Sequence, residues 1–157
     1  MKNRNQHTTV TNSANQTELL AAALAANFDG STTIQLIGDL GAGKTQFVRG
    51  LAAGIASDDQ VQSPSFMLQR IYNGDPYNIH HFDLYRLDNP GVLADELAES
   101  LADPDALVAI EWAQTVADLL PKDTITIEIT ASDTNKRQFV FTNLNQDQAK
   151  AINDFNN

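Results

Sequence analysis

The chain has 157 residues, of which 42% are hydrophobic and 19% are charged, a composition typical of a single globular domain with a buried core. It contains 20 acidic residues, 10 basic residues and no cysteine, which excludes a disulfide framework and a thiolate metal site. Because nucleic-acid binding depends on clustered basic side chains, we expect no strong direct binding to RNA or DNA. The longest apolar stretch, residues 19–26, is too short to cross a bilayer. The N-terminus lacks the apolar run of a signal peptide, so we expect a cytoplasmic protein with no membrane segment.

The first third of the chain predicts a helix, then a strand, a glycine-rich loop and a second helix. Residues 1–10 are polar, and we expect them to be a loose end. A capping signal at Asn12 or Ser13 and a stop at Asp29-Gly30 predict a helix over about 15–27, and apolar periodicity predicts another over about 44–56. Between them, the β-branched apolar run at 32–37 predicts a buried strand that leads into the glycines of 38–43.

The rest of the chain predicts further strands and helices around a mixed sheet. Strands over 65–72 and 77–82 flank a strong turn signal at 73–76, and such a short connection makes the pair antiparallel. The other expected elements are a helix over 92–102, a buried strand over 106–110, a helical turn over 113–119, a strand over 124–130, a strand over 138–142 that pairs with it, and a loose or weakly helical end over 145–157. The prediction is an α/β P-loop NTPase fold, one domain over 1–157, with a mixed parallel and antiparallel sheet flanked by helices.

The segment GDLGAGKT at 38–45 matches the phosphate-binding P-loop pattern. Its glycines allow the backbone N–H groups to approach a phosphate closely, and the following helix adds its positive N-terminal end. Lys44 would bind the β- and γ-phosphates, and the Thr45 hydroxyl would bind Mg²⁺. The nucleotide-binding residues predicted from this segment are Gly38, Asp39, Leu40, Gly41, Ala42, Gly43, Lys44, Thr45 and Gln46. We therefore expect a nucleoside triphosphate with Mg²⁺ as ligand.

A P-loop also needs a second acid near the metal, at the end of a neighbouring buried strand. Glu111 and Asp83 both follow predicted strands, and the pattern alone leaves open which of them serves the metal. Trp112 can pack beside a nucleotide, although core packing explains it equally well. His80 and His81 are adjacent on a strand and so face opposite ways, which favours structural roles over a shared metal. Arg49 and Arg86 are weaker candidates for phosphate contacts, because single arginines are usually solvated.

Five segments in sequence order resemble the TsaE family, formerly YjeE. They are GDLGAGKTQFVRGLA at 38–52, SPSF at 63–66, HFDLYRL at 81–87, EW at 111–112 and LP at 120–121. The resemblance covers about residues 10–140 and implies a small bacterial P-loop ATPase required for threonylcarbamoyladenosine synthesis in tRNA. It implies TsaB and TsaD as partners, with TsaD, together with TsaB, transferring the threonylcarbamoyl group. The chain would use energy to reset that complex.

The resemblance also implies roles for single residues. Lys44 would bind phosphate, Thr45 and Glu111 would hold Mg²⁺, and Asp83 would be needed for hydrolysis, so the predicted catalytic residues are Lys44, Asp83 and Glu111. Trp112 would lie close to the nucleotide. By the same resemblance, residues 63–66 would form a switch-like segment near the γ-phosphate, and Arg137 corresponds to a C-terminal arginine near the nucleotide. The family often has Thr or Ser where this chain has Gln46, and SPTF or SPTY where it has SPSF; neither change removes a metal ligand.

Two other functions fit the P-loop. A small-molecule kinase usually has several arginines in a lid over the phosphates, whereas this chain has five scattered arginines. A nucleotide-dependent switch would hydrolyse slowly until a partner is present. The chain has no guanine-recognition motif of the Asn/Thr-Lys-x-Asp type, which favours ATP as the nucleotide.

Overall fold

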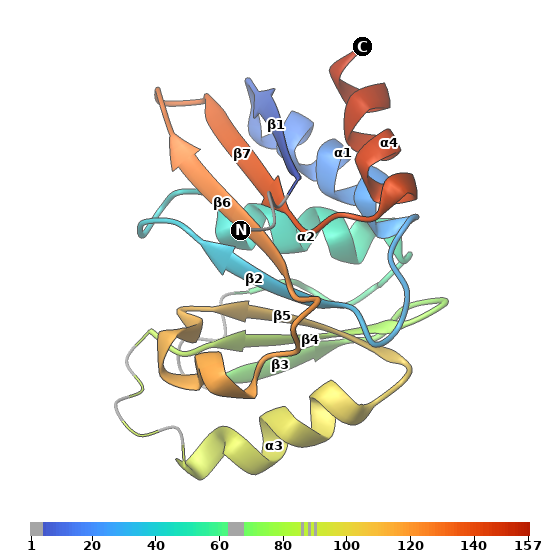
Figure 1. Ribbon diagram of the computed structural model, residues 1–157. Helices are drawn as coiled ribbons and strands as arrows, with labels where there is room; N and C mark the ends of the chain where they lie inside the picture. Colours follow the sequence, from blue (N-terminus) through green and yellow to red (C-terminus); the bar gives the residue numbers. More distant parts are fainter. Residues whose placement is uncertain (1–4, 63–67, 86, 88, 90) are drawn as a thin grey trace.

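The computed structural model describes residues 5–62, 68–85, 87, 89 and 91–157. Its centre is a seven-stranded sheet in the order β1-β7-β6-β2-β5-β4-β3 (Figure 1). The strands are β1 (Gln6–Thr11), β2 (Thr33–Ile37), β3 (Gln69–Tyr72), β4 (Asn78–Asp83), β5 (Ala106–Glu111), β6 (Ile125–Ala131) and β7 (Arg137–Thr142). The helices are α1 (Ala14–Ala25), α2 (Lys44–Gly54), α3 (Gly91–Ala102), α4 (Gln146–Asn156) and a 3-10 segment, η1 (Ala113–Leu119).

The sheet is mixed, as the sequence predicts. Strands β6, β2, β5 and β4 run parallel, whereas β1 and β7 extend one edge antiparallel and β3 extends the other. The predicted antiparallel hairpin around residues 73–76 is confirmed as the β3–β4 pair. The four parallel strands carry their carboxyl ends to one edge of the sheet, where ligands bind in open α/β folds.

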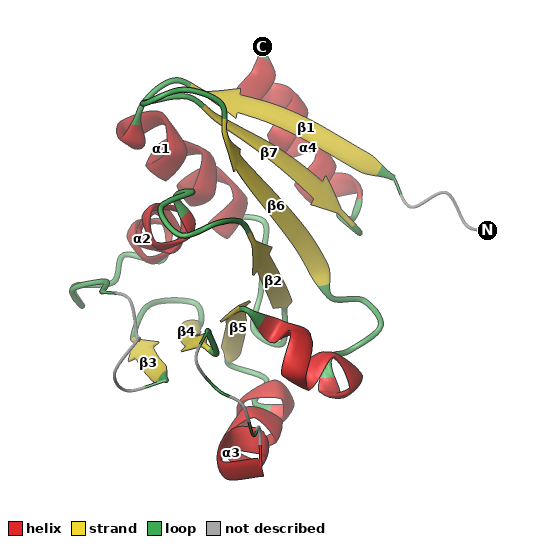
Figure 2. Cartoon of the chain, turned by 90° about the vertical axis from the view of Figure 1, so that its left-hand side faces the viewer, coloured by secondary structure: helices red, strands yellow, loops and turns green. Residues whose placement is uncertain are grey.

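Helices cover both faces of the sheet. Figure 2 shows α1, α2 and α4 on one face, and α3 with η1 on the other. On the first face Phe47 of α2 packs against Phe139 and Phe141 of β7, with ring centroids 5.7 and 6.4 Å apart. On the second face, Phe82 and Leu97 belong to a separate cluster of buried side chains. The apolar runs of the central strands are therefore buried from both sides.

Helices α1 and α2 lie against each other at Gly50. A Cβ atom added there would lie 2.5 Å from the Glu18 carbonyl oxygen and 2.7 Å from the Ala21 Cβ atom. Only a residue without a side chain allows this approach. This contact holds the start of α1 beside the glycine loop. Ser13 caps the helix there, because its hydroxyl accepts a hydrogen bond from the Gln16 backbone N–H at 3.1 Å.

The expectation of a loose N-terminal end is wrong for residues 6–10, whereas the C-terminal end takes the helical form that was one of its two expected alternatives. The N-terminal segment forms β1, whose Thr9 and Thr11 side chains are buried while it pairs with β7. The C-terminal segment forms α4, which begins with a capping box between Asn145 and Gln148 and buries Ile152. Both segments are mostly polar, so their hydrophobic pattern is weak. The strand forms because threonine fits a pleated strand, and the helix forms because a capping box stabilises a short helix. No helix in the described ranges is both long and apolar enough to span a membrane.

Candidate functional site

The carboxyl ends of three parallel strands bring the predicted site residues together. The glycine loop follows β2, Asp83 ends β4 and Glu111 ends β5. Asp83 and Glu111 are register partners across β4 and β5, and Glu111 is also the partner of Leu36 on β2. Both acids therefore lie beside the loop, as expected for parallel strands whose carboxyl ends meet at one edge of the sheet.

The loop requires glycine at two positions. Gly41 has φ 79° and Gly43 has φ 112°, values that side chains make unfavourable. Gly43 is also the N-cap of α2, so the first N–H groups of this helix face the loop without intrahelical partners. An anion placed there would be attracted by these donors and by the positive end of the helix.

A pocket of about 480 Å³ opens at this edge of the sheet. Its lining includes ten residues named from the sequence: Leu40, Gly41, Gly43, Lys44, Thr45, Gln46, Asp83, Glu111, Trp112 and Arg137. Three others, Gly38, Asp39 and Ala42, line a neighbouring hollow together with residues of β6. The loop thus lines both of these hollows, and of the two only the first contains Asp83 and Glu111.

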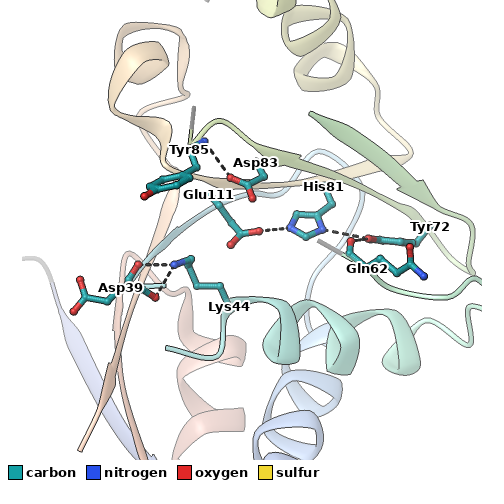
Figure 3. Close-up of polar contacts among 9 residues, drawn as sticks. Asp39, Lys44, Gln62, Tyr72, His81, Asp83, Tyr85 and Glu111 are labelled. Carbon is teal, nitrogen blue, oxygen red and sulfur yellow. Dashed lines mark hydrogen bonds and ion pairs between the residues drawn. The ribbon is translucent and has the colours of Figure 1, made fainter. Parts of the chain in front are cut away.

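Lys44 is held inside the loop. Its Nζ atom donates hydrogen bonds to the carbonyl oxygens of Gly38 at 2.5 Å and Asp39 at 3.0 Å (Figure 3). The same atom lies 4.8 Å from the ring centroid of Trp112, which is within cation–π range. A bound phosphate would compete with these two carbonyls for an ammonium group that already faces the pocket.

Trp112 has a left-handed backbone, with φ 57° and ψ 51°, which is unfavourable for a bulky residue. Its ring packs against Tyr85, with centroids 4.9 Å apart. Strain of this kind tends to occur at functional sites, where the surroundings stabilise it. Here it places an aromatic surface directly after Glu111 and above Lys44.

Both acids are buried, Glu111 at 3% exposure and Asp83 at 7%. The Glu111 carboxylate oxygen Oε2 lies 2.7 Å from His81 Nε2, and Asp83 Oδ1 accepts a hydrogen bond from the Tyr85 N–H at 3.1 Å. Together with the Thr45 hydroxyl, these two carboxylates offer oxygen ligands, which Mg²⁺ prefers. Among the described residues, no group of three or more His, Cys, Asp or Glu side chains is arranged to hold a metal. This donor set suits a cation that also takes phosphate oxygens and water.

The two histidines of β4 face opposite sides, as their adjacency predicts. His81 lies on the side of Glu111 and Tyr72, and His80 Nδ1 lies 2.7 Å from the Ser100 hydroxyl of α3. Burial lowers the pKa of His80, an effect that Asp103 partly opposes. His80 therefore belongs to the packing of α3, while His81 contacts the pocket through an acid.

Arg137, at the start of β7, lies across the loop from α2. Its Nη1 group donates to the carbonyl oxygens of Asp133 at 2.9 Å, Lys136 at 3.0 Å and Thr134 at 3.3 Å. The Nε atom is 3.6 Å from the position that a Cβ atom on Gly43 would take. The guanidinium thus connects the β6–β7 turn to the glycine-loop end of the pocket.

Several lining residues were not found by reasoning from the sequence. They are Ser13, Ala14, Thr17, Tyr85, Thr134 and Asn135. Ser13 has a capping signal, but nothing local shows that the start of α1 lies beside the loop. Arg49 also lines the pocket, whereas Arg86 and the segment 63–66 lie outside the described residues.

A strand, a glycine loop and a helix, with a lysine and a hydroxyl at the helix start, define the P-loop class of nucleotide-binding folds. The family described as "Threonylcarbamoyl adenosine biosynthesis protein TsaE" matches residues 11–139, so the chain belongs to the TsaE family. A similar protein is the tRNA threonylcarbamoyladenosine biosynthesis protein TsaE of Rickettsia conorii, 36% identical over 80% of this chain and 72% of its own. The Bacillus subtilis protein of the same name is 30% identical over 81% of this chain and 79% of its own.

The fold is also similar to a crystal structure of Bacillus subtilis YdiB. The superposition has a TM-score of 0.78, covers 99% of this chain and 97% of that one, and the two are 25% identical. The likeness extends over the whole sheet and its helices, including β1 and α4, which lie beyond or near the ends of the family match.

Proposed function

We propose that the chain is a Mg²⁺-dependent ATPase that serves threonylcarbamoyladenosine biosynthesis in tRNA, acting in the cytoplasm with the TsaB and TsaD proteins. The observation that carries this proposal is the convergence of Lys44, Thr45, Glu111 and Asp83 on one pocket beside a glycine loop. The family description names the biosynthetic process. The net charge of −10 supports an indirect connection with tRNA, through partner proteins.

Binding would use the loop first. The N–H groups at the start of α2 and the Lys44 ammonium would hold the phosphates, in exchange for the contacts of Lys44 with two loop carbonyls. The Arg137 guanidinium, which lies beside Gly43, would add positive charge near the phosphates. Trp112 would pack against the nucleotide, because its ring already lies over Lys44.

Hydrolysis would use the acids. Thr45 and Glu111 would hold Mg²⁺, directly or through water, and the ion would neutralise charge that develops on the phosphates. Asp83 would orient or deprotonate the attacking water. The hydrogen bond that one Asp83 carboxylate oxygen accepts from the Tyr85 N–H at the end of β4 supports this role.

The proposal is tested by measuring phosphate release from Mg·ATP by the purified chain, first alone and then with TsaB and TsaD. We expect slow turnover alone, stimulation by the partners, and loss of both in Lys44→Ala. Lys150→Ala is the matched control, since Lys150 is exposed and, within the described residues, its ion pair is with Asp154 on the same helix. Absence of stimulation, with phosphate appearing on a small molecule, would instead favour a kinase. Partner binding that depends on ATP without turnover would favour a nucleotide-dependent switch.

A further inference from the structure

Glu111, one of the two pocket acids, is held by a buried side chain from the neighbouring strand. His81 has no exposed surface, and its Nε2 atom lies 2.7 Å from Glu111 Oε2. The pairing of β4 with β5 creates this contact, because His81 is two residues before Asp83, the register partner of Glu111. His81 and Asp83 therefore project from the same face of β4.

The opposite side of the imidazole ring is also held. His81 Nδ1 lies 3.3 Å from the Tyr72 hydroxyl, and that hydroxyl donates its hydrogen to the Gln62 carbonyl oxygen at 2.8 Å. Burial raises the pKa of Tyr72 above its ordinary value, so the hydroxyl keeps its hydrogen at neutral pH. The ring has a polar partner at each nitrogen, and rotation about its side-chain bonds would break both contacts.

In this arrangement the two carboxylate oxygens of Glu111 have different neighbours. Oε2 is occupied by His81, while Figure 3 shows the other carboxylate oxygen pointing away from the ring. In the described part of the chain, the only side-chain hydrogen bond or ion pair of Glu111 is the one to His81. The second oxygen is thus left for the pocket that Glu111 lines with Lys44 and Thr45.

We propose that His81 is a positioning residue, whose imidazole fixes the Glu111 carboxylate so that one oxygen is presented to Mg²⁺ bound with the nucleotide. This proposal rests on the proposed function, since it assigns Glu111 to the metal. Partners that orient a metal-binding side chain commonly change metal affinity or activity by about 10- to 100-fold when removed. His81 would act in this way without touching substrate or metal.

The two amide substitutions of His81 separate positioning from packing. In His81→Gln the longer side chain places an N–H group near the Nε2 position, where it can donate to Glu111. In His81→Asn the shorter side chain places its amide near the Nδ1 position, where it meets Tyr72 and leaves Glu111 without a partner. Both variants remove the ring from the same buried site, so a purely structural role would affect them similarly.

The measurement is a Mg²⁺ titration of the full chain with a saturating non-hydrolysable ATP analogue, followed by fluorescence. Trp112 is the chain's only tryptophan and lies next to Glu111, so its emission would report the site. We expect the Mg²⁺ concentration at half-saturation to rise about 10- to 100-fold in His81→Asn and to stay within a few-fold of wild type in His81→Gln. Nucleotide affinity in EDTA should be equal in all three.

His80→Asn is the matched control, because His80 is the adjacent buried histidine and contacts Ser100 instead of Glu111. It should bind Mg²⁺ like wild type. Equal half-saturation in His81→Asn and His81→Gln, or an equal loss in His80→Asn, would overturn the positioning role while leaving the proposed function intact. A wild-type chain that hydrolyses no ATP, even with the partners, and shows no Mg²⁺-dependent nucleotide signal would overturn both.

Discussion

Asp83 and Glu111 are register partners on adjacent parallel strands, yet their carboxylates have different neighbours. Glu111 is bound by an imidazole at 2.7 Å, whereas Asp83 accepts a hydrogen bond from the backbone N–H two residues later. Two acids at one edge with different partners can divide metal binding and water activation between them.

This division predicts different losses in the two alanine variants. Glu111→Ala should weaken Mg²⁺-dependent nucleotide binding, because Glu111 is the proposed metal ligand, while Asp83→Ala should keep binding and lose turnover. Equilibrium nucleotide binding with and without Mg²⁺, combined with single-turnover hydrolysis, separates the two effects. The reverse pattern, with binding lost in Asp83→Ala and retained in Glu111→Ala, would exchange the two roles.

Gly43→Ala tests the shape of the loop. A side chain at φ 112° is strained, with a cost of at least about 1–2 kcal/mol, and relaxation would turn the first N–H groups of α2 away from the phosphates. We expect nucleotide affinity to fall about tenfold or more, from the relation of 1.4 kcal/mol to a factor of ten. Isothermal titration measures this. Gly91→Ala, at the exposed start of α3, is the control and should bind nucleotide normally.

Gly50→Ala tests the contact between α1 and α2. The added methyl group would meet the Glu18 backbone and the Ala21 side chain, and overpacking of this kind costs roughly 1–3 kcal/mol. Thermal unfolding should show a lower Tm, and nucleotide binding should weaken because α1 carries the Ser13 wall of the pocket. Ala53→Ser, at an exposed position of the same helix, should change neither. An unchanged Tm in Gly50→Ala would contradict the close packing.

His80 predicts a pH dependence of stability. Burial lowers its pKa in the folded state, so the unfolded chain, with an ordinary pKa of about 6.5, binds more protons between the two values. The stability that the buried, neutral His80 contributes is fully present above about pH 6.5. It is lost as the pH falls toward the lowered pKa of His80 in the folded state. Unfolding by urea at several pH values between about 5.5 and 7.5 should show a smaller slope in His80→Asn than in wild type.

Local sequence patterns are sufficient to predict the elements at the centre of the fold. The strand before the glycine loop, the helix after it and the buried strand ending at Glu111 each have a strong pattern of their own, so their positions were predicted nearly to the residue. The site acids followed from the same patterns, since parallel strands end at one edge. Residues outside such patterns were predicted less well.

The missed features depend on long-range contacts. Ser13 and Thr17 reach the pocket only because α1 lies against Gly50 of α2. The link from His81 to Glu111 depends on the register of β4 with β5. No local periodicity reports a register, so the sequence indicated a structural histidine without indicating its partner.

The pairing of β1 with β7 has a consequence for synthesis on the ribosome. Gln6 has Thr142 as its partner, so β1 can pair only after β7 has been synthesised, and contacts this distant in sequence form slowly. The pocket lining includes Arg137 of β7 as well as Ser13 at the start of α1, so its completion also depends on the synthesis of β7. A nascent chain that does not yet extend through β7 would hold the glycine loop without Arg137, so we expect the complete pocket to form only after β7 has been synthesised.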